Sequence, residues 1–152
     1  MSGDPTRAVA HRVTIALPTH GGTRWLRAAV ASVRAQTYDR WRLVVVDDAS
    51  TDGTADLADE LARDDDRIEV VRLERNVGVA VARDTAIRHG GPAGLVALLD
   101  QDDVLEPEFL GRCVALYDEA LAAGRRPGVV ACDAWLLDDA GTRTGTFSER
   151  FG

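Results

Sequence analysis

The regular alternation of apolar, β-rich runs with amphipathic segments constrains the fold of this chain more than any other feature. Each of four apolar runs, at 13–17, 43–46, 67–73 and 95–99, precedes a segment with helical spacing. A fifth run at 128–137 leads through the turn sequence DDAG into a last β-rich run at 142–147. Strands that alternate with helices at this spacing pair in parallel through crossover connections. The pattern therefore predicts one α/β domain over 12–152, with a mostly parallel sheet and helices on both faces.

Two of the apolar runs are hydrophobic on both faces, as expected for strands buried inside a parallel sheet. They are LVVV at 43–46 and LVALL at 95–99. The helical segment after the second of these is expected to have Pro107 in its first turn and to end at Gly124. Proline is tolerated at the start of a helix and glycine commonly ends one.

The composition is that of a globular protein, with 45% hydrophobic and 28% charged residues in a chain of 152. The formal net charge of −7 argues against a nucleic-acid partner, because binding a phosphate backbone needs clustered cations. All 18 basic residues are arginines, which excludes any mechanism that requires a lysine. No apolar run approaches the roughly 18 residues needed to span a bilayer.

The same features predict a cytoplasmic location, including the inner face of the membrane. Residues 1–11 contain no apolar stretch that could serve as a secretory signal, and we expect them to form a disordered leader. Cys113 and Cys132 are isolated in apolar surroundings and match no metal-ligand spacing. We expect both to be reduced core cysteines.

Carboxylates follow both of the runs that are apolar on two faces. Asp47 and Asp48 follow the run at 43–46, and Asp100, Asp102 and Asp103 follow the run at 95–99. In open α/β sheets, ligands bind beyond the carboxyl ends of the strands, near the point where the strand order reverses. The first pair could equally serve a turn and a helix cap. The cluster of three is harder to explain structurally, because its carboxylates repel one another and no cation lies in the same loop.

Such a cluster must raise its pKa values, recruit arginines from elsewhere in the chain, or bind a cation. In an extended segment, Asp100 and Asp102 would point to the same side, because the side-chain period of a strand is two. Hard oxygen donors without a nearby His or Cys favour Mg²⁺ or Mn²⁺. A magnesium-type site commonly uses one or two carboxylates and leaves its other positions to water and substrate phosphates. The cluster therefore predicts a site for a metal-bound diphosphate.

Four sequence blocks resemble, in order and spacing, those of the family 2 glycosyltransferases, which have the GT-A fold. They are VTIALPTH, LVVVDDASTDGT, NVGVAVARDTAI and LLDQDDVLEPEFL, and the match runs from Val13 to about Leu137. The resemblance implies a Rossmann-like GT-A nucleotide-sugar-binding domain over 12–152 that stops after the donor-binding half. It also implies metal-dependent transfer of a sugar from a UDP-, GDP- or dTDP-linked donor to a glycan, lipid or small-molecule acceptor, with inversion at the anomeric carbon.

Carried over position by position, the resemblance assigns roles at the first two strand ends. Pro18 and Thr19 would line the nucleotide pocket. Asp48 would accept a hydrogen bond from the base, and Asp47 would support the loop.

The resemblance also assigns roles to the later blocks. Asp100 and Asp102 would be the D-x-D pair that holds the metal, with Asp102 as the direct ligand and Gln101 between them in contact with the donor. The third block would lie near the ribose and diphosphate through Asn76, Gly78 and Arg83. Arg83 could equally be a structural partner for one of the strand-end aspartates.

The sequence departs from the family pattern at two places. His20 and Gly21 replace a common Tyr-Asn in the first loop, and Asp84 replaces the usual Asn after Ala-Arg. We interpret His20 as a loop residue rather than a catalytic base. The change at Asp84 affects local contacts but not the expected fold.

The general base of the family is typically a carboxylate beyond the D-x-D strand, so we expect it to be missing from this chain. Asp133, Asp138 and Asp139 are the remaining acids on the last strand and turn, and a solvated turn explains the latter two. The strand carrying Trp135 is expected to leave an uncovered sheet edge, which favours self-association.

Two other classes of protein share some of these sequence features. A catalytically inactive module that binds nucleotide sugar or metal would share the donor site and lack turnover. A phosphoacceptor receiver domain also has aspartates at strand ends, but it needs a lysine, and this chain has none.

Overall fold

The computed structural model describes residues 11–91 and 94–151, which fall into two units on either side of Val114. Apart from His11, the expected leader at 1–11 lies outside the described residues. The strands are β1 (Val13–Thr19), β2 (Trp41–Asp47), β3 (Ile68–Arg72), β4 (Leu95–Leu98), β5 (Trp135–Leu137) and β6 (Arg143–Thr146). The helices are α1 (Leu26–Arg34), α2 (Thr54–Ala62), α3 (Val79–His89), α4 (Phe109–Ala122) and α5 (Phe147–Phe151).

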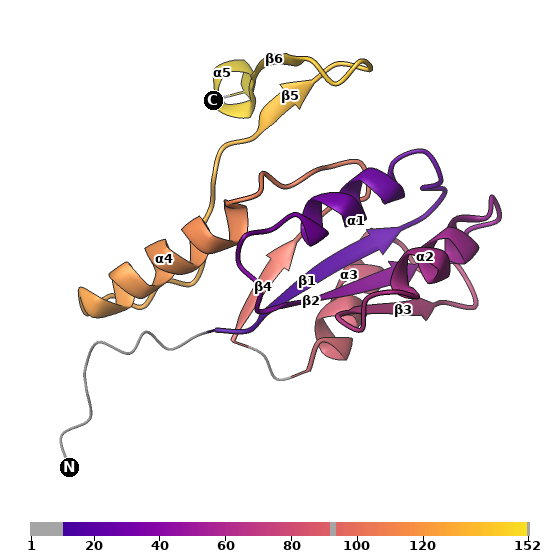
Figure 1. Cartoon of the computed structure of the whole chain (residues 1–152), viewed down its shortest axis with the longest axis horizontal. Coiled ribbons are helices and arrows are strands. Elements are labelled where there is room, and N and C mark those ends of the chain that lie inside the picture. Colours follow the sequence, from indigo (N-terminus) through magenta and orange to yellow (C-terminus); the bar gives the residue numbers. More distant parts are fainter. Residues whose placement is uncertain (1–10, 92–93, 152) are drawn as a thin grey trace. The chain divides into compact units, whose positions relative to one another are not determined.

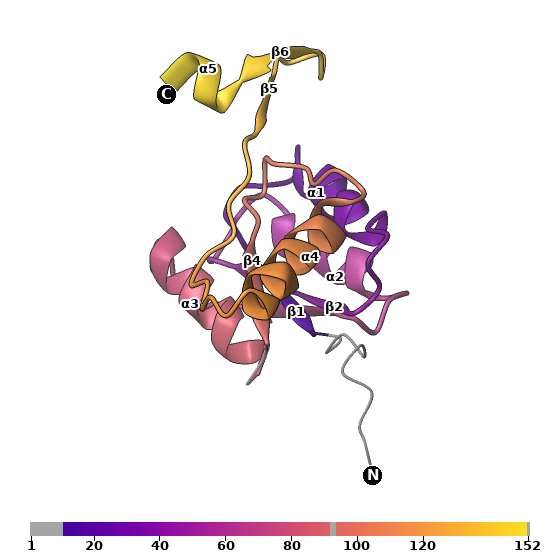
Figure 2. The same ribbon diagram turned by 90° about the vertical axis from the view of Figure 1, so that its left-hand side faces the viewer.

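The first unit is built on a sheet of four parallel strands in the order β3-β2-β1-β4 (Figure 1). Large side chains such as Ile15, Leu17 and Leu43 pack between one face of this sheet and α1, α2 and the start of α4. The other face is covered by α3 through the small residues Ala82 and Ala86. Figure 2 shows α3 on one side of the strands and α1 and α2 on the other. The expected α/β fold with helices on both faces is confirmed.

The order of the strands places a crevice beside β1. The chain runs from β1 through β2 to β3 on one side and then returns to place β4 on the other. Pairing of β1 with β2 extends to Thr19, whereas pairing with β4 ends at Ala16 and Leu98. Ala16 accepts a hydrogen bond from Leu99 on the β4 side, so Pro18 is the next residue that would face β4, and it has no N–H to donate. The sheet therefore opens at Pro18, at the reversal of strand order where ligands of such folds bind.

The expectation that the run at 95–99 is buried on both faces is wrong. In β4, Val96 and Leu98 are 45% and 55% exposed, whereas the alternate residues pack into the core. The cause is that β4 is an edge strand and α3 packs over β1 and β2. Two apolar side chains thus remain uncovered on the α3 side of the first unit.

The second unit differs from the expected pattern in several respects. Only Trp135–Leu137 of the run at 128–137 forms a strand, and it pairs with β6 as an antiparallel ribbon. The run at 142–147 is a strand only to Thr146, after which α5 begins. In the first unit, α4 begins at Phe109, two residues beyond Pro107. Cys132 is exposed and Cys113 only partly buried, so neither is the core residue that was expected.

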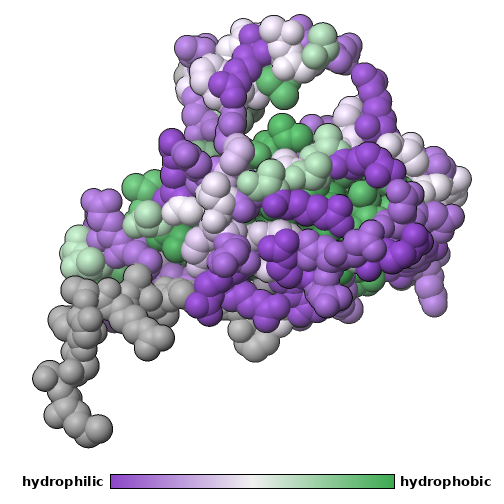
Figure 3. Space-filling model, viewed as in Figure 1, coloured by the Kyte–Doolittle hydropathy of each residue, from purple (hydrophilic) through white to green (hydrophobic). Residues whose placement is uncertain are grey.

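The face shown in the space-filling view carries both hydrophilic and hydrophobic atoms, and the green hydrophobic atoms gather near its centre (Figure 3). Among the residues that the structure describes, no helix combines the length and apolar character needed to cross a membrane.

Self-association through a sheet edge stays a prediction, and β4 is the edge on which we now place it. Its exposed Val96 and Leu98 offer an apolar strip on a strand that, within the described part of the chain, pairs only with β1. We expect wild-type protein to show a concentration-dependent increase in sedimentation coefficient, and Leu98→Glu to abolish it. A wild-type protein that sediments as a monomer at high concentration would contradict this prediction.

Asp65, in the turn before β3, should make the stability of the first unit depend on pH. Its carboxylate accepts hydrogen bonds from Nε and Nη2 of Arg67, both at 2.9 Å. These bonds hold the pKa of Asp65 below its ordinary value of 3.8. A lowered pKa stabilises the folded state above the ordinary value, and this contribution is lost as the pH falls through the folded-state pKa.

We therefore expect Asp65→Asn to lower the free energy of unfolding by about 1 kcal/mol at pH 7. In urea titrations, the difference from wild type should shrink as the pH falls below about 4. The exposed neighbour Asp64 gives the matched control, Asp64→Asn, which should have no effect. A difference that stays constant across this pH range would argue against the role of the Asp65 charge.

Candidate functional site

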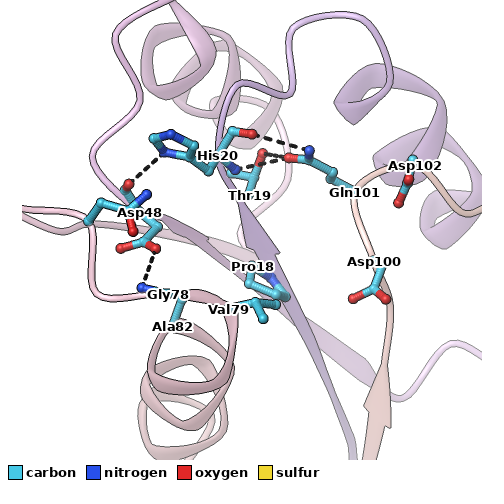
Figure 4. Close-up of a pocket in the computed structure, with 11 residues that line it drawn as sticks. Pro18, Thr19, His20, Asp48, Gly78, Val79, Ala82, Asp100, Gln101 and Asp102 are labelled. Atoms are coloured by element: carbon cyan, nitrogen blue, oxygen red, sulfur yellow. Dashed lines mark hydrogen bonds between the residues drawn. The ribbon is translucent and has the colours of Figure 1, made fainter.

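A pocket of about 270 Å³ lies at the carboxyl ends of the strands in the first unit (Figure 4). It is lined by residues after all four strands, namely Pro18, Thr19, His20, Asp48, Asn76, Gly78, Val79, Ala82, Asp100, Gln101 and Asp102. In Figure 4, Asp48 lies on one side, Asp100 and Asp102 on the other, and Pro18 and Val79 between them. The pocket lining thus contains eight of the ten site residues expected from the sequence, and Asp47 and Arg83 are the two that do not line it. The volume is at the low end for ligand pockets and suits part of a nucleotide.

Asp48, after β2, holds the loop that precedes α3. Its Oδ1 accepts a hydrogen bond from the backbone N–H of Val77 at 2.7 Å, and its Oδ2 accepts one from Gly78 at 2.8 Å. The residue is only 3% exposed. Because Gly78 is the N-cap of α3, the Asp48 charge also faces the positive end of the helix dipole. Asp48 therefore fixes this wall of the pocket. A nucleotide base in the pocket would meet a carboxylate that already accepts two hydrogen bonds.

Two residues beside these contacts have unusual backbone conformations. Ala49 has φ 55°, a left-handed conformation that non-glycine residues adopt at a cost of about 1 kcal/mol or more. Gly78 has φ 87° and ψ 155°, a region that is open essentially to glycine alone. Such strain concentrates at functional sites, and here it turns the chain on both sides of the Asp48 contact.

Asp47 supports the turn after β2 and does not line the pocket. It ends β2 and is 2% exposed. Its Oδ2 accepts a hydrogen bond from the N–H of Ser50 at 3.2 Å, while its Oδ1 is buried without a hydrogen-bond partner within the described part of the chain. Asp47 thus shapes the turn that carries Asp48 and Ala49.

Gln101 ties the loop after β1 to the turn after β4. Its Oε1 accepts hydrogen bonds from Oγ1 of Thr19 at 2.5 Å and from the N–H of His20 at 2.9 Å. Its Nε2 donates to the carbonyl of His20 at 3.2 Å. A β-carbon at Gly22 would collide with this pair, so glycine is required there by close approach. Gln101 lines the pocket, but its amide is engaged with the first loop.

A second network, which the sequence reasoning missed, fixes the loop after β1 from the α2 side. Oδ1 of Asp52 accepts hydrogen bonds from the N–H and hydroxyl of Thr54, and the N–H of Gly22 donates to that hydroxyl at 2.8 Å. The hydrogen bond from the Thr54 hydroxyl is the largest of the effects that lower the pKa of Asp52. The D-G-T sequence before a helix was the available signal, since Asp and Thr are capping residues.

His20 is held in the first loop, consistent with its interpretation as a loop residue. Its Nδ1 lies 2.8 Å from the backbone oxygen of Asp48 and therefore donates to it. The ring thus joins the loops after β1 and β2 while lining the pocket.

The acidic cluster after β4 is not extended, so the argument that placed Asp100 and Asp102 on one side of a strand is wrong. The N–H of Asp103 donates to the carbonyl of Asp100 at 3.1 Å, and this bond closes a turn. Both Asp100 and Asp102 nevertheless line the pocket. Poor solvation, and after it repulsion by Asp102 and Asp100, raises the pKa of Asp103.

Arg83 supplies the distant cation that the cluster was expected to recruit. It projects from α3 and forms an ion pair through Nη2 with Oδ1 of Asp100. Asp102 has no ion-pair partner among the residues that the structure describes. The cluster thus combines two of the three expected solutions, a raised pKa and an arginine, and leaves Asp102 available to a cation.

The acids of the second unit serve local structure. Asp133 accepts hydrogen bonds from the N–H and hydroxyl of Ser148 at the start of α5, and the hydroxyl bond lowers the pKa of Asp133. Asp138 accepts from the N–H groups of Ala140 and Thr142, as expected for a turn.

Substituting Gly78 tests whether the strained loop matters to the pocket. Gly78→Ala should lower the free energy of unfolding by about 1–3 kcal/mol, because alanine does not tolerate this conformation. It should also weaken binding of a nucleoside diphosphate, since the N–H held by Asp48 shifts. Gly124→Ala is the control, because Gly124 also has a positive φ of 72° but lies in the second unit. Calorimetric titration should show loss of affinity for Gly78→Ala alone, and equal affinities would refute the prediction.

A parallel sheet with a pocket at its reversal of strand order, walled by carboxylates and by a helix N-terminus, places the protein in the Rossmann-like class of α/β folds. Comparison with known proteins narrows this class. The sequence model of Glycosyl transferase family 2 matches residues 14–135, and the chain belongs to this family. The fold is accordingly the GT-A fold.

Individual relatives agree with this assignment. TuaG of Bacillus subtilis (strain 168), named as a teichuronic acid biosynthesis glycosyltransferase, is 40% identical over 128 residues, which are 83% of this chain and 50% of TuaG. The Escherichia coli glucosyltransferase WfgD, whose name specifies UDP-Glc, is 36% identical over 60% of this chain and 35% of its own. The chain therefore spans half or less of these relatives.

Two solved structures share the fold. S. aureus TarS (1–349) in complex with UDP superposes with a TM-score of 0.66 at 26% identity, over 72% of this chain and 33% of TarS. The mannosyltransferase PcManGT from Pyrobaculum calidifontis, in complex with GDP-Man and Mn²⁺, gives a TM-score of 0.58 at 30% identity, over 68% and 30% of the two chains.

Proposed function

We propose that this chain is the donor-binding part of a glycosyltransferase that transfers a sugar, with inversion, from a nucleotide-diphosphate donor to a glycan, lipid or small-molecule acceptor. The observation that carries the proposal is the pocket itself, because residues from all four family blocks converge on it. Nucleotide complexes of structural relatives support it. We also propose a cytoplasmic location, at the inner face of the membrane if the acceptor is a lipid.

Mg²⁺ or Mn²⁺ is the proposed cofactor, and the residues present fit it. No group of three or more potential ligands of the His, Cys, Asp or Glu type was found in the described part of the chain. A magnesium-type site needs only one or two carboxylates, however, and Asp100 and Asp102 are hard oxygen donors on one pocket wall. Asp102 would be the direct ligand. When bound, the ion would act as a Lewis acid for the leaving diphosphate.

The proposed work of the protein residues is to bind and orient the donor. Gln101 would orient the loop that carries Pro18 and Thr19 for contact with the donor, and Asp48 would hold Val77 and Gly78, next to Asn76, for the same purpose. Arg83, which pairs with Asp100 of the pocket wall, would meet a phosphate oxygen of the donor. We assign no general base, since every described acid of the pocket serves the loop, the ion pair or the metal.

That last observation favours one alternative, a module that binds nucleotide sugar without turnover. Calorimetric titration with UDP, GDP and dTDP, with and without Mn²⁺, tests binding by either protein. Metal-dependent release of nucleoside diphosphate from the matching nucleotide sugar, abolished by Asp102→Asn, would identify the transferase. Donor affinity without any release would identify the binding module, and absence of both would refute the proposal.

A further inference from the structure

The ion pair between Arg83 and Asp100 occupies one of the two carboxylates proposed to hold the metal. Arg83 contacts Asp100 through one nitrogen, Nη2, while its Nε is buried and has no hydrogen-bond partner among the described residues. The Arg83 side chain is 27% exposed and that of Asp100 is 51% exposed. The pair is therefore neither fully buried nor fully satisfied, and a guanidinium in this state can exchange one anion for another at modest cost.

We propose that Arg83 is a resident counter-cation that competes with the divalent metal for Asp100, and that an incoming diphosphate draws Arg83 away and frees this carboxylate. The inference rests on the proposed function. Arg83 already contacts Oδ1 of Asp100, which lines the pocket, so a diphosphate bound against that wall would come within reach of its guanidinium. Guanidinium groups bind phosphate oxygens with strong, charge-assisted hydrogen bonds.

The charges around the pair explain why the exchange would matter. Asp102 and Asp103 lie in the same turn as Asp100, so without Arg83 three carboxylates would repel one another. Arg83 relieves that repulsion when no metal is bound, but it also repels a dication and masks one ligand. Metal alone should therefore bind weakly, and metal and diphosphate should each favour the other through Arg83 in addition to their direct contact.

The inference makes a prediction with an unusual sign, namely that removing a positive residue improves metal binding. In the absence of nucleotide, Arg83→Met should bind Mn²⁺ about fivefold more tightly than wild type, which is the upper range for a half-exposed ion pair. The free Mn²⁺ signal in electron paramagnetic resonance gives this affinity directly. The same variant should bind inorganic pyrophosphate more weakly in metal-free buffer, because the phosphate partner is gone.

Arg88→Met is the matched control for charge. Arg88 lies in the last turn of the same helix, where it pairs with Asp84 and is 76% exposed. Its removal changes the net charge equally without touching Asp100. Equal Mn²⁺ affinities for the two variants, or a weaker affinity for Arg83→Met, would overturn the inference.

A second comparison decides the question even if Arg83→Met does not fold. In metal-free buffer, Asp100→Asn should release Arg83 and bind pyrophosphate about threefold more tightly than Asp102→Asn does. Both variants lose one negative charge from the same wall, so only the release of Arg83 separates them. Equal pyrophosphate affinities would overturn the inference.

Failure of the inference can be told apart from failure of the proposed function. If wild-type protein binds Mn²⁺ in the presence of UDP, GDP or dTDP but the variants show no difference, only the role of Arg83 is refuted. If wild-type protein binds neither Mn²⁺ nor any of these nucleotides, the proposed donor site is refuted and the role of Arg83 with it.

Discussion

Asp102→Asn should lower the metal-dependent affinity for a nucleoside diphosphate by about 100-fold, the size expected when a carboxylate ligand of a metal bound to phosphate is lost. Of the two carboxylates on the β4 side of the pocket, Asp100 is paired with Arg83, whereas Asp102 has no arginine partner in the described part of the chain and can offer a full negative charge to a cation. An amide of the same shape keeps the packing and removes that charge. The measurement is calorimetric titration of the preferred nucleoside diphosphate with Mn²⁺ and with EDTA.

Two features of the result would identify a metal ligand rather than a general charge effect. The loss should appear only with Mn²⁺, and in EDTA the variant should bind at least as well as wild type because repulsion of the phosphates falls. Asp64→Asn, in the loop at the opposite end of the sheet, should match wild type under both conditions. An equal loss with Mn²⁺ and with EDTA would show that Asp102 does not act through a metal.

Asp48→Asn should have the largest effect on the folded structure of the site. Both carboxylate oxygens accept backbone hydrogen bonds at 2.7 and 2.8 Å, and the side chain is almost fully buried. An asparagine would turn an NH₂ group toward one of these N–H donors and leave that donor unpaired. Loss of a buried, charge-assisted hydrogen bond costs about 2–3 kcal/mol, which we expect as the decrease in the free energy of unfolding.

The same change should weaken nucleotide binding, because Val77 and Gly78 would no longer be held beside the pocket. Asp47→Asn is the informative comparison, since Asp47 is equally buried but does not line the pocket. We expect Asp47→Asn to affect stability, measured by urea titration, far more than affinity. If both variants lost affinity equally, Asp48 would have no special role at the pocket wall.

The sequence pattern was sufficient to predict the first four strands and helices, in their order along the chain, and to predict the family. Periodicity reports which faces of an element are buried, and the alternation of elements restricts the connections. It was not sufficient for β4, because the run at 95–99 that contains this strand is apolar on both faces although Val96 and Leu98 are exposed. Periodicity cannot distinguish a central strand from an edge strand that awaits cover, because strand order is set by packing between elements.

The site was predicted in the same uneven way. Strand ends bring their side chains to one edge of a sheet, so the convergence of Pro18, Asp48 and Asp102 could be expected from position alone. The partner of each side chain could not, since Gln101 binds Thr19 across 82 positions of sequence and Arg83 could have taken either of two roles. The turn at Asp100 was missed because the strand was assumed to continue through the acidic cluster.

The wall of the pocket is complete only when the ends of all four strands are in register, since each of them contributes part of it. Ligand binding then depends on the whole sheet being folded. A ligand that binds only the folded state stabilises that state by mass action, so its concentration affects global unfolding. At a free ligand concentration 100 times the Kd, this coupling adds about 2.7 kcal/mol to the free energy of unfolding. Local unfolding at any one of these strand ends would release the ligand. We therefore expect the protection of β4 amides from hydrogen exchange to rise with nucleotide concentration as steeply as the protection of β1 amides.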